Sequence, residues 1–152
     1  MKLKILGKRH VKKIFALIKK QWGADVYFKH VFLQDRNGKL YIVNRDISRI
    51  DINKLQINSI GMYFGAIANE ELRLSIEASQ MIGPSAEKNT INLKKEQISK
   101  WLAGNDLDYL GEERGFVLIR YKNDFLGAGR IKEGKILNFI PKPRRLKSTE
   151  II

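Results

Sequence analysis

The sequence contains no cysteine, and it has only three prolines and two histidines among 152 residues. The absence of cysteine excludes disulfide scaffolds, thiolate zinc sites and cysteine nucleophiles. It fits a reducing compartment, so we expect a cytoplasmic protein. Neither His10 nor His30 has the spacing of a metal ligand, and we expect both to be surface or half-buried residues.

Long apolar segments are also missing. Apolar stretches such as Phe116 to Ile119 are far shorter than the roughly 20 residues that cross a bilayer. The basic N-terminal region is not followed by the apolar stretch of a secretory signal, so we expect no such signal. With 43% hydrophobic residues the chain can still build a core, which excludes wholesale disorder.

Acidic residues are scarce, and the first one is Asp25. The chain has 29 Lys and Arg against 16 Asp and Glu, a formal net charge of +13. Positive charge gathers near both ends, with eight basic residues among the first 20 and four among residues 142–147, where no acid lies. This charge favours a polyanionic partner, nucleic acid first and an anionic membrane second. A basic protein without such a partner stays open as the alternative.

Apolar residues recur at i, i+3, i+4, i+7 and i+11 early in the chain, which predicts a helix that ends at Gly23. Two β-rich runs, 27–33 and 40–43, flank Asn37-Gly38, and this pair predicts a hairpin because type I′ turns need positive φ. Residues 57–68 and 72–76 read as further strands, followed by a short helix up to Met81. The helical stripe consists of Val11, Ile14, Phe15, Ile18 and Trp22.

Gly83-Pro84-Ser85 is the plausible boundary inside the chain. We therefore predict an N-terminal α/β domain at 1–84 and a C-terminal domain at 85–152. The second domain is predicted to contain a short strand, one helix and several strands joined by tight turns, a pattern that suits a small barrel with a covering helix and an α+β fold. These elements are expected at 90–93, 94–101, 116–121, 125–131 and 136–140.

Motifs for catalysis are weak. The glycines at 61 and 65 and at 127 and 129 do not match a dinucleotide or phosphate loop, and close packing within strands explains them better. Asp106 and Asp108 lack the spacing of a calcium loop, so we expect a turn-forming role for them. Pro141 and Pro143 should hold the closing segment extended, so that Arg144 and Arg145 meet successive phosphates. A frayed basic tail is an equal alternative.

The second half resembles a PUA domain, a small RNA-binding pseudobarrel. The closing string looks like the end of PUA domains attached to RNA cytosine methyltransferases. In the first half, Ser59–Gly65 and Leu72–Ala78 look like the pre-PUA domain of large-subunit ribosome-biogenesis factors of archaea and eukaryotes. The PUA resemblance is carried by Lys94–Trp101, Gly104–Leu107, Gly115–Arg120, Phe125–Ile131 and Leu137–Leu146.

This resemblance implies an RNA-binding protein that is not an enzyme and uses no cofactor or metal. In PUA domains the helix, the loop after it and the final strand face RNA. Asp106 and Asp108 depart from that pattern because acids repel phosphate, which gives the C-terminal cluster more weight. The positions that match the RNA-facing side are Lys94, Lys95, Lys100, Gly104, Asn105, Lys142, Arg144, Arg145 and Lys147.

We therefore expect a protein that binds structured or uridine-rich RNA during maturation of large-subunit rRNA. Its partners would be rRNA, its precursors or tRNA, together with ribosome-assembly or RNA-modification proteins, and no membrane. The alternative is an accessory subunit of an RNA-modifying enzyme such as an rRNA or tRNA methyltransferase. An enzyme for a small anion and a protein adaptor remain further hypotheses. Trp101 and Phe139 could stack on bases, although core packing explains them better.

Overall fold

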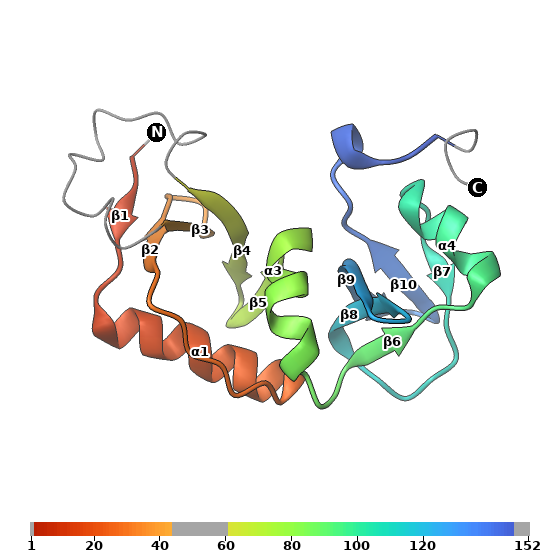
Figure 1. Cartoon of the computed structure of the whole chain (residues 1–152), viewed down its shortest axis with the longest axis horizontal. Helices are drawn as coiled ribbons and strands as arrows, with labels where there is room; N and C mark the ends of the chain where they lie inside the picture. Colours follow the sequence, from red (N-terminus) through yellow and green to blue (C-terminus); the bar gives the residue numbers. More distant parts are fainter. Residues whose placement is uncertain (1, 44–60, 148–152) are drawn as a thin grey trace.

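The computed structural model describes residues 2–43 and 61–147, which form two five-stranded sheets with helix α3 (Ile76–Ile82) between them (Figure 1). The first sheet is antiparallel throughout. Helix α1 (Lys8–Trp22) packs against it. In spatial order this sheet contains β1 (Lys4–Ile5), β2 (Val31–Gln34), β3 (Lys39–Val43), β4 (Met62–Ala68) and β5 (Glu71–Leu74).

The predicted first helix is confirmed and begins three residues earlier than its apolar stripe. Its inner side chains Ile14, Ile18 and Trp22 are almost completely buried. Gly23 ends the helix with φ +68°, and its N–H donates to the Lys19 carbonyl at 2.8 Å. Glycine suits this position because other residues adopt such a φ at a cost.

The predicted hairpin is also confirmed, as β2 and β3 pair around Asn37-Gly38. The Asp35 carboxylate accepts hydrogen bonds from the backbone N–H groups of Asn37 and Lys39, both at 2.9 Å, and so fixes the turn. The strand expected at 57–68 is observed from Met62 onward, and positions 57–60 lie outside the described residues.

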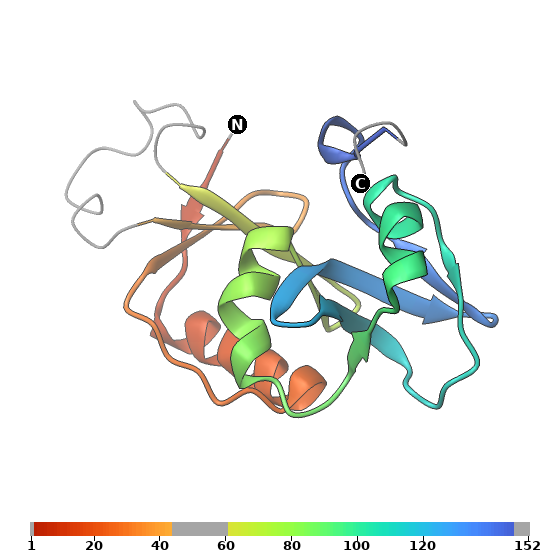
Figure 2. The ribbon, with the colours of Figure 1, turned by 45° about the vertical axis from the view of Figure 1, so that its right-hand side comes forward.

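The second sheet curls into a half-barrel, with helix α4 (Lys95–Leu102) covering its interior (Figure 2). Trp101 on α4 is fully buried, and its indole N–H donates to the Leu126 carbonyl at 2.9 Å. The core-packing interpretation of Trp101 is thus correct. Strands β6 and β8 are parallel and the other pairs antiparallel. The spatial order is β6 (Thr90–Asn92), β8 (Gly115–Tyr121), β9 (Asp124–Lys132), β10 (Lys135–Asn138) and β7 (Leu107–Asp108).

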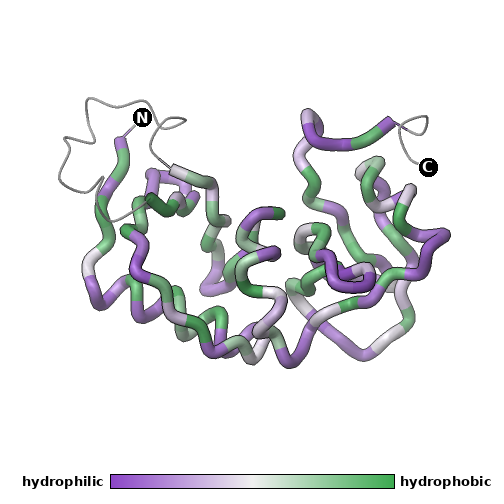
Figure 3. Tube along the Cα trace, in the orientation of Figure 1, coloured by the Kyte–Doolittle hydropathy of each residue, from purple (hydrophilic) through white to green (hydrophobic). Residues whose placement is uncertain are grey.

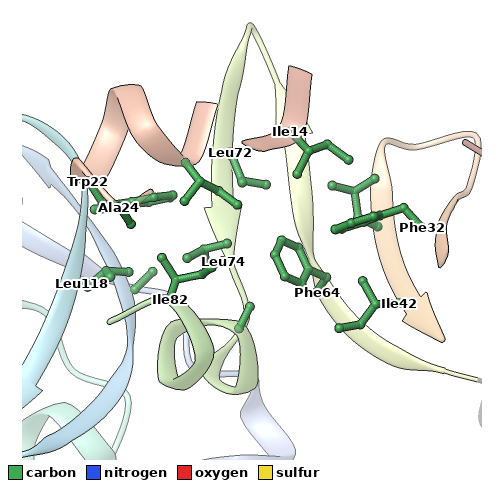
Figure 4. Close-up of a cluster of buried hydrophobic side chains, with 14 of the residues drawn as sticks. Ile14, Trp22, Ala24, Phe32, Ile42, Phe64, Leu72, Leu74, Ile82 and Leu118 are labelled. Atoms are coloured by element: carbon green, nitrogen blue, oxygen red, sulfur yellow. The ribbon is translucent and has the colours of Figure 1, made fainter. Parts of the chain in front are cut away.

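One hydrophobic cluster joins the two halves of the chain (Figure 4). Side chains alternate along β8, so Val117 and Ile119 enter the second core while Leu118 enters the first. There Leu118 lies in the same cluster as Ile82 of α3 and Leu74 of β5. The division at residue 84 stays a prediction, because the first core draws residues from both sides of it.

The tube in Figure 3 alternates between hydrophilic and hydrophobic residues along α1, as expected for a helix with one face in water. The lysines of this helix that lie off the apolar stripe are all exposed. Within the described ranges, no helix is long and apolar enough to cross a membrane.

Candidate nucleic-acid interface

Helix α4 presents three of the predicted cations to solvent. Lys94 is the N-cap residue, and its backbone N–H donates to the Gln97 side-chain oxygen at 2.9 Å. Lys95 and Lys100 are exposed, and neither forms an ion pair with a carboxylate of the described residues. Lys100 lies in the last turn, where a positive charge is favoured by the helix dipole. These ammonium groups are therefore available to a phosphate backbone.

The loop after α4 is held in place by backbone contacts. Gly104 has φ +93° and donates its N–H to the Trp101 carbonyl at 3.0 Å. The backbone N–H of Asn105 donates to the Lys100 carbonyl at 3.0 Å. The backbone carbonyl of Asn105 accepts a hydrogen bond from the side-chain amide of Asn138 at 3.0 Å. The predicted loop residues are thus fixed by hydrogen bonds to both α4 and β10.

The two loop carboxylates have partners. Asp106 accepts a hydrogen bond from the backbone N–H of Asn138 at 2.8 Å, a contact with β10 and not within its own turn, so this contact does not support the turn-forming interpretation. Asp108 forms an ion pair with Lys135 at 3.3 Å across β7 and β10, with both side chains well exposed. In the described part of the chain, no group of three or more His, Asp or Glu residues could hold a metal ion.

The closing segment is not extended as predicted. Residues Lys142–Arg144 form a 3₁₀ turn, with the N–H groups of Arg144 and Arg145 folded back onto the Pro141 and Lys142 carbonyls. The expectation of a straight string was wrong because the φ that proline imposes also fits a 3₁₀ turn. Arg144 and Arg145 therefore do not lie along one line of phosphates.

Arg145 joins the predicted loop. The backbone N–H of Leu146 donates to the Leu102 carbonyl at 2.9 Å, which places the segment beside the end of α4. Arg145 donates from Nε to the Ile140 carbonyl at 2.9 Å. Its side chain covers Gly104 so closely that a Cβ on this glycine would overlap Cδ and Nε of Arg145. The structure thus places Arg145 against Gly104, and both belong to the set of residues that the resemblance assigned to RNA.

Arg144 faces another part of the molecule. Its guanidinium forms an ion pair with the Glu77 carboxylate on α3, where the two side chains are 46% and 36% exposed. This contact directs Arg144 toward α3 and away from helix α4. Lys142 and Lys147 are exposed on either side of the two arginines.

Sequence reasoning missed a groove between the two sheets, although it considered Phe139 and Arg144, which line the groove, as possible RNA contacts. The groove holds about 410 Å³. Phe139 is only half-buried and belongs to neither core, so the structure does not support the core-packing interpretation. The other lining residues come from several strands, and no local motif connects them. Its polar and aromatic lining includes Lys39, Tyr41, Tyr63, Arg73, Glu77, Phe139 and Arg144.

The phenol of Tyr41 on β3 is less acidic than that of an ordinary tyrosine. Burial raises the pKa of its phenol above 10.0, and the nearby Asp35 carboxylate and Tyr63 raise this pKa further. A phenolate is costly in this environment. Tyr41 therefore stays neutral and can act as a hydrogen-bond donor throughout the physiological pH range.

Comparison with known proteins shows what the region around helix α4 is similar to. Residues 88–146 match the family described as the PUA domain of the methyltransferase RsmF. The second half of the chain thus contains a PUA-like domain, as its curled sheet and covering helix also indicate.

The relatives are bacterial enzymes. Ribosomal RNA small subunit methyltransferase F from two strains of Vibrio cholerae serotype O1, M66-2 and El Tor Inaba N16961, is 23% identical over 92 residues. The match covers 60% of this chain and 20% of the methyltransferase. Fewer than 92 residues lie between Lys88 and the last residue of the sequence. The match to the methyltransferase must therefore also include part of the first half of the chain. These relatives are rRNA methyltransferases rather than the ribosome-biogenesis factors that the sequence interpretation named.

Proposed function

We propose that this chain is a non-catalytic, cytoplasmic RNA-binding protein that acts in the maturation of ribosomal RNA. The observation that carries the proposal is the match of residues 88–146 to the PUA domain of an rRNA methyltransferase family, whose helix here displays exposed lysines. The large-subunit assignment rests on the resemblance of the first half alone. The chain spans about a fifth of the length of its relatives, so no methyl transfer is proposed for it.

The binding mechanism is electrostatic docking, with recognition of the shape of the RNA, on the α4 surface. We define this surface as Lys94, Lys95, Lys100, Gly104 and Arg145. Lysines neutralise phosphates and release counterions, and this attraction does not depend on sequence. The fixed loop holds Gly104 against the Arg145 side chain, which places that cation beside the end of α4. Four neutralised phosphates on a single strand correspond to a log–log salt slope of about −2.8.

Titrations with ribosomal RNA fragments test the proposal. Fluorescence anisotropy should show binding of a structured rRNA fragment at low salt, with a steep loss of affinity as salt rises. A DNA duplex of the same length is the matched control for charge alone. Equal affinity for both, or no binding of the rRNA fragment at low salt, contradicts the proposal. Crosslinking in the native cell followed by sequencing of bound RNA then identifies the RNA.

A second candidate function is that of an accessory subunit for an RNA methyltransferase. The names of the relatives favour it, since the matched region makes up 20% of a protein that is named as a methyltransferase. Affinity purification of the tagged chain separates the two candidates. A stoichiometric methyltransferase partner supports the accessory role, whereas precursor ribosomal particles without such an enzyme support independent action.

A further inference from the structure

The groove between the two sheets is lined by aromatic rings as well as cations, whereas the α4 surface contains cations and no aromatic ring. We call it the inter-sheet groove. The end of β5, the start of α3, the middle of β9 and the segment after β10 all contribute lining residues. Figure 1 shows where these elements lie in the fold. A second hollow of about 360 Å³ continues it past Arg130 and Phe116. The two hollows share Lys39, Arg73 and Phe139.

Two aromatic pairs line this groove. Tyr41 and Tyr63 lie side by side on β3 and β4, with ring centroids 5.6 Å apart. Phe116 of β8 and Phe139 after β10 have centroids 6.0 Å apart. All four side chains are partly exposed. Aromatic rings that are left in contact with water at a groove offer flat apolar faces to a ligand.

Two arginines lie over these rings. The Arg73 guanidinium carbon is 4.7 Å from the Phe139 ring centroid, and that of Arg130 is 5.3 Å from the Phe116 centroid. A guanidinium has five N–H donors, so an arginine in cation–π contact with a ring can still donate to a phosphate. Each of these two partly exposed rings therefore has an arginine side chain over it.

The charge balance of the groove favours an anion. Lys39, Arg73, Arg130 and Arg144 line the two hollows, against Glu71 and Glu77. Glu77 already pairs with Arg144. An acidic ligand with flat rings therefore fits better than an apolar peptide or a cation.

We propose that the inter-sheet groove binds an unpaired segment of RNA, whose bases stack on Tyr63 and Phe139 while its phosphates contact Arg73 and Arg130. This inference rests on the proposed RNA-binding function and names the substrate of a second, separate surface. A duplex does not suit the groove because its bases are already stacked on one another and present only their edges. Stacking on aromatic side chains tolerates any base, so we expect little sequence preference.

A double variant tests the aromatic contacts. Tyr63→Leu with Phe139→Leu keeps apolar side chains but removes both ring faces. For a labelled single-stranded RNA of about ten nucleotides, we expect the affinity to fall by about 10-fold or more. Tyr27→Leu is the control, because Tyr27 is 74% exposed and does not line the groove. Unchanged oligonucleotide affinity in the folded double variant overturns the proposal.

Photocrosslinking of the wild-type chain keeps the proposal testable if the double variant does not fold. An oligonucleotide containing 4-thiouridine should crosslink to peptides that contain Tyr63 or Phe139. Crosslinks confined to α4 and its loop, or no binding of the oligonucleotide by the wild-type chain, overturn the groove assignment. A structured rRNA fragment is titrated in parallel. Its binding decides the proposed function separately, because loss of groove binding alone leaves the α4 surface intact.

Discussion

Arg144 and Arg145 are neighbours in the sequence, yet they contact different elements. Arg144 pairs with Glu77 on α3, whereas Arg145 covers Gly104 after α4 and donates to the Ile140 carbonyl at 2.9 Å. The 3₁₀ turn at Lys142–Arg144 separates their directions. The closing segment therefore belongs to both the inter-sheet groove and the α4 surface, and the two arginines should respond differently to substitution.

The ion pair of Glu77 with Arg144 should compete with RNA binding at the inter-sheet groove. Glu77→Gln should strengthen binding of single-stranded RNA by up to about 5-fold, because it frees the guanidinium and removes a negative charge from the groove. Arg144→Ala should weaken the same binding. Both changes should alter the unfolding free energy by less than about 1 kcal/mol, since the pair is half-exposed. Anisotropy titrations and urea denaturation measure the two quantities.

The control for this prediction is Glu87→Gln, which removes an exposed carboxylate that does not line the groove. If Glu87→Gln strengthens binding as much as Glu77→Gln, the effect comes from net charge and not from release of Arg144.

Gly104 and Arg145 should be energetically coupled. Gly104→Ala is expected to destabilise the chain by about 1 kcal/mol or more, because its φ is +93° and a Cβ would overlap Arg145. Arg145→Ala relieves the overlap but not the backbone strain. The double variant should therefore lose less stability than the sum of the two single variants. Additive losses in urea denaturation would show that the Arg145 side chain does not cover residue 104 in solution.

Leu118 should link the stability of the two halves. This residue is completely buried and extends from the second sheet into the first core. Leu118→Ala is expected to cost about 2–5 kcal/mol of unfolding free energy. Tryptophan fluorescence and circular dichroism should still report one common unfolding transition. Leu110→Ala is the control, because Leu110 is 99% exposed and its truncation should change stability by no more than about 0.5 kcal/mol.

Separate transitions for the two halves in wild type, or a Leu118→Ala cost no larger than that of the control, would contradict a shared core. Separate transitions would instead favour two independent domains divided near residue 84.

The phenol of Tyr41 should lose its proton at a higher pH than that of an ordinary tyrosine. Its raised pKa means that the folded chain keeps the phenolic proton at a pH where an ordinary tyrosine has lost it. The difference between ultraviolet titrations of wild type and Tyr41→Phe should show one tyrosine with a midpoint above 10.0. Because the folded pKa is raised, Tyr41 leaves stability unaffected below pH 10.0 and lowers it as pH rises further. A midpoint at or below 10.0 would show that Tyr41 is well hydrated.

Local patterns predicted most of the fold. The stripe that ends at Trp22, the Asn37-Gly38 hairpin and the helix around Trp101 all follow from spacing along the chain, and each is confirmed. Two strands, β1 and β7, were not predicted because each has only two residues, too few for an alternation to show. Their pairing depends on neighbours that are distant in sequence.

The candidate site was predicted in part for the same reason. Lys95, Lys100 and Gly104 follow a local helix-and-loop pattern, and the structure places them on one side of the second sheet. The inter-sheet groove depends instead on contacts such as Arg73 with Phe139, whose partners are far apart in the sequence. A local signal existed in Tyr41, which alternates with the buried residues Leu40 and Ile42 on β3 and therefore faces away from the first core.

The location of ribosomal RNA binding tests the central claim most directly. Lys95→Glu with Lys100→Glu reverses two exposed charges on α4, and Lys12→Glu with Lys13→Glu makes the same charge change on α1. With a structured rRNA fragment, we expect the α4 variant to lose about 10-fold or more in affinity and its log–log salt slope to become shallower by about 0.7 for each lost phosphate contact. The α1 variant should change far less. Equal losses for the two variants would contradict binding at the PUA-like domain.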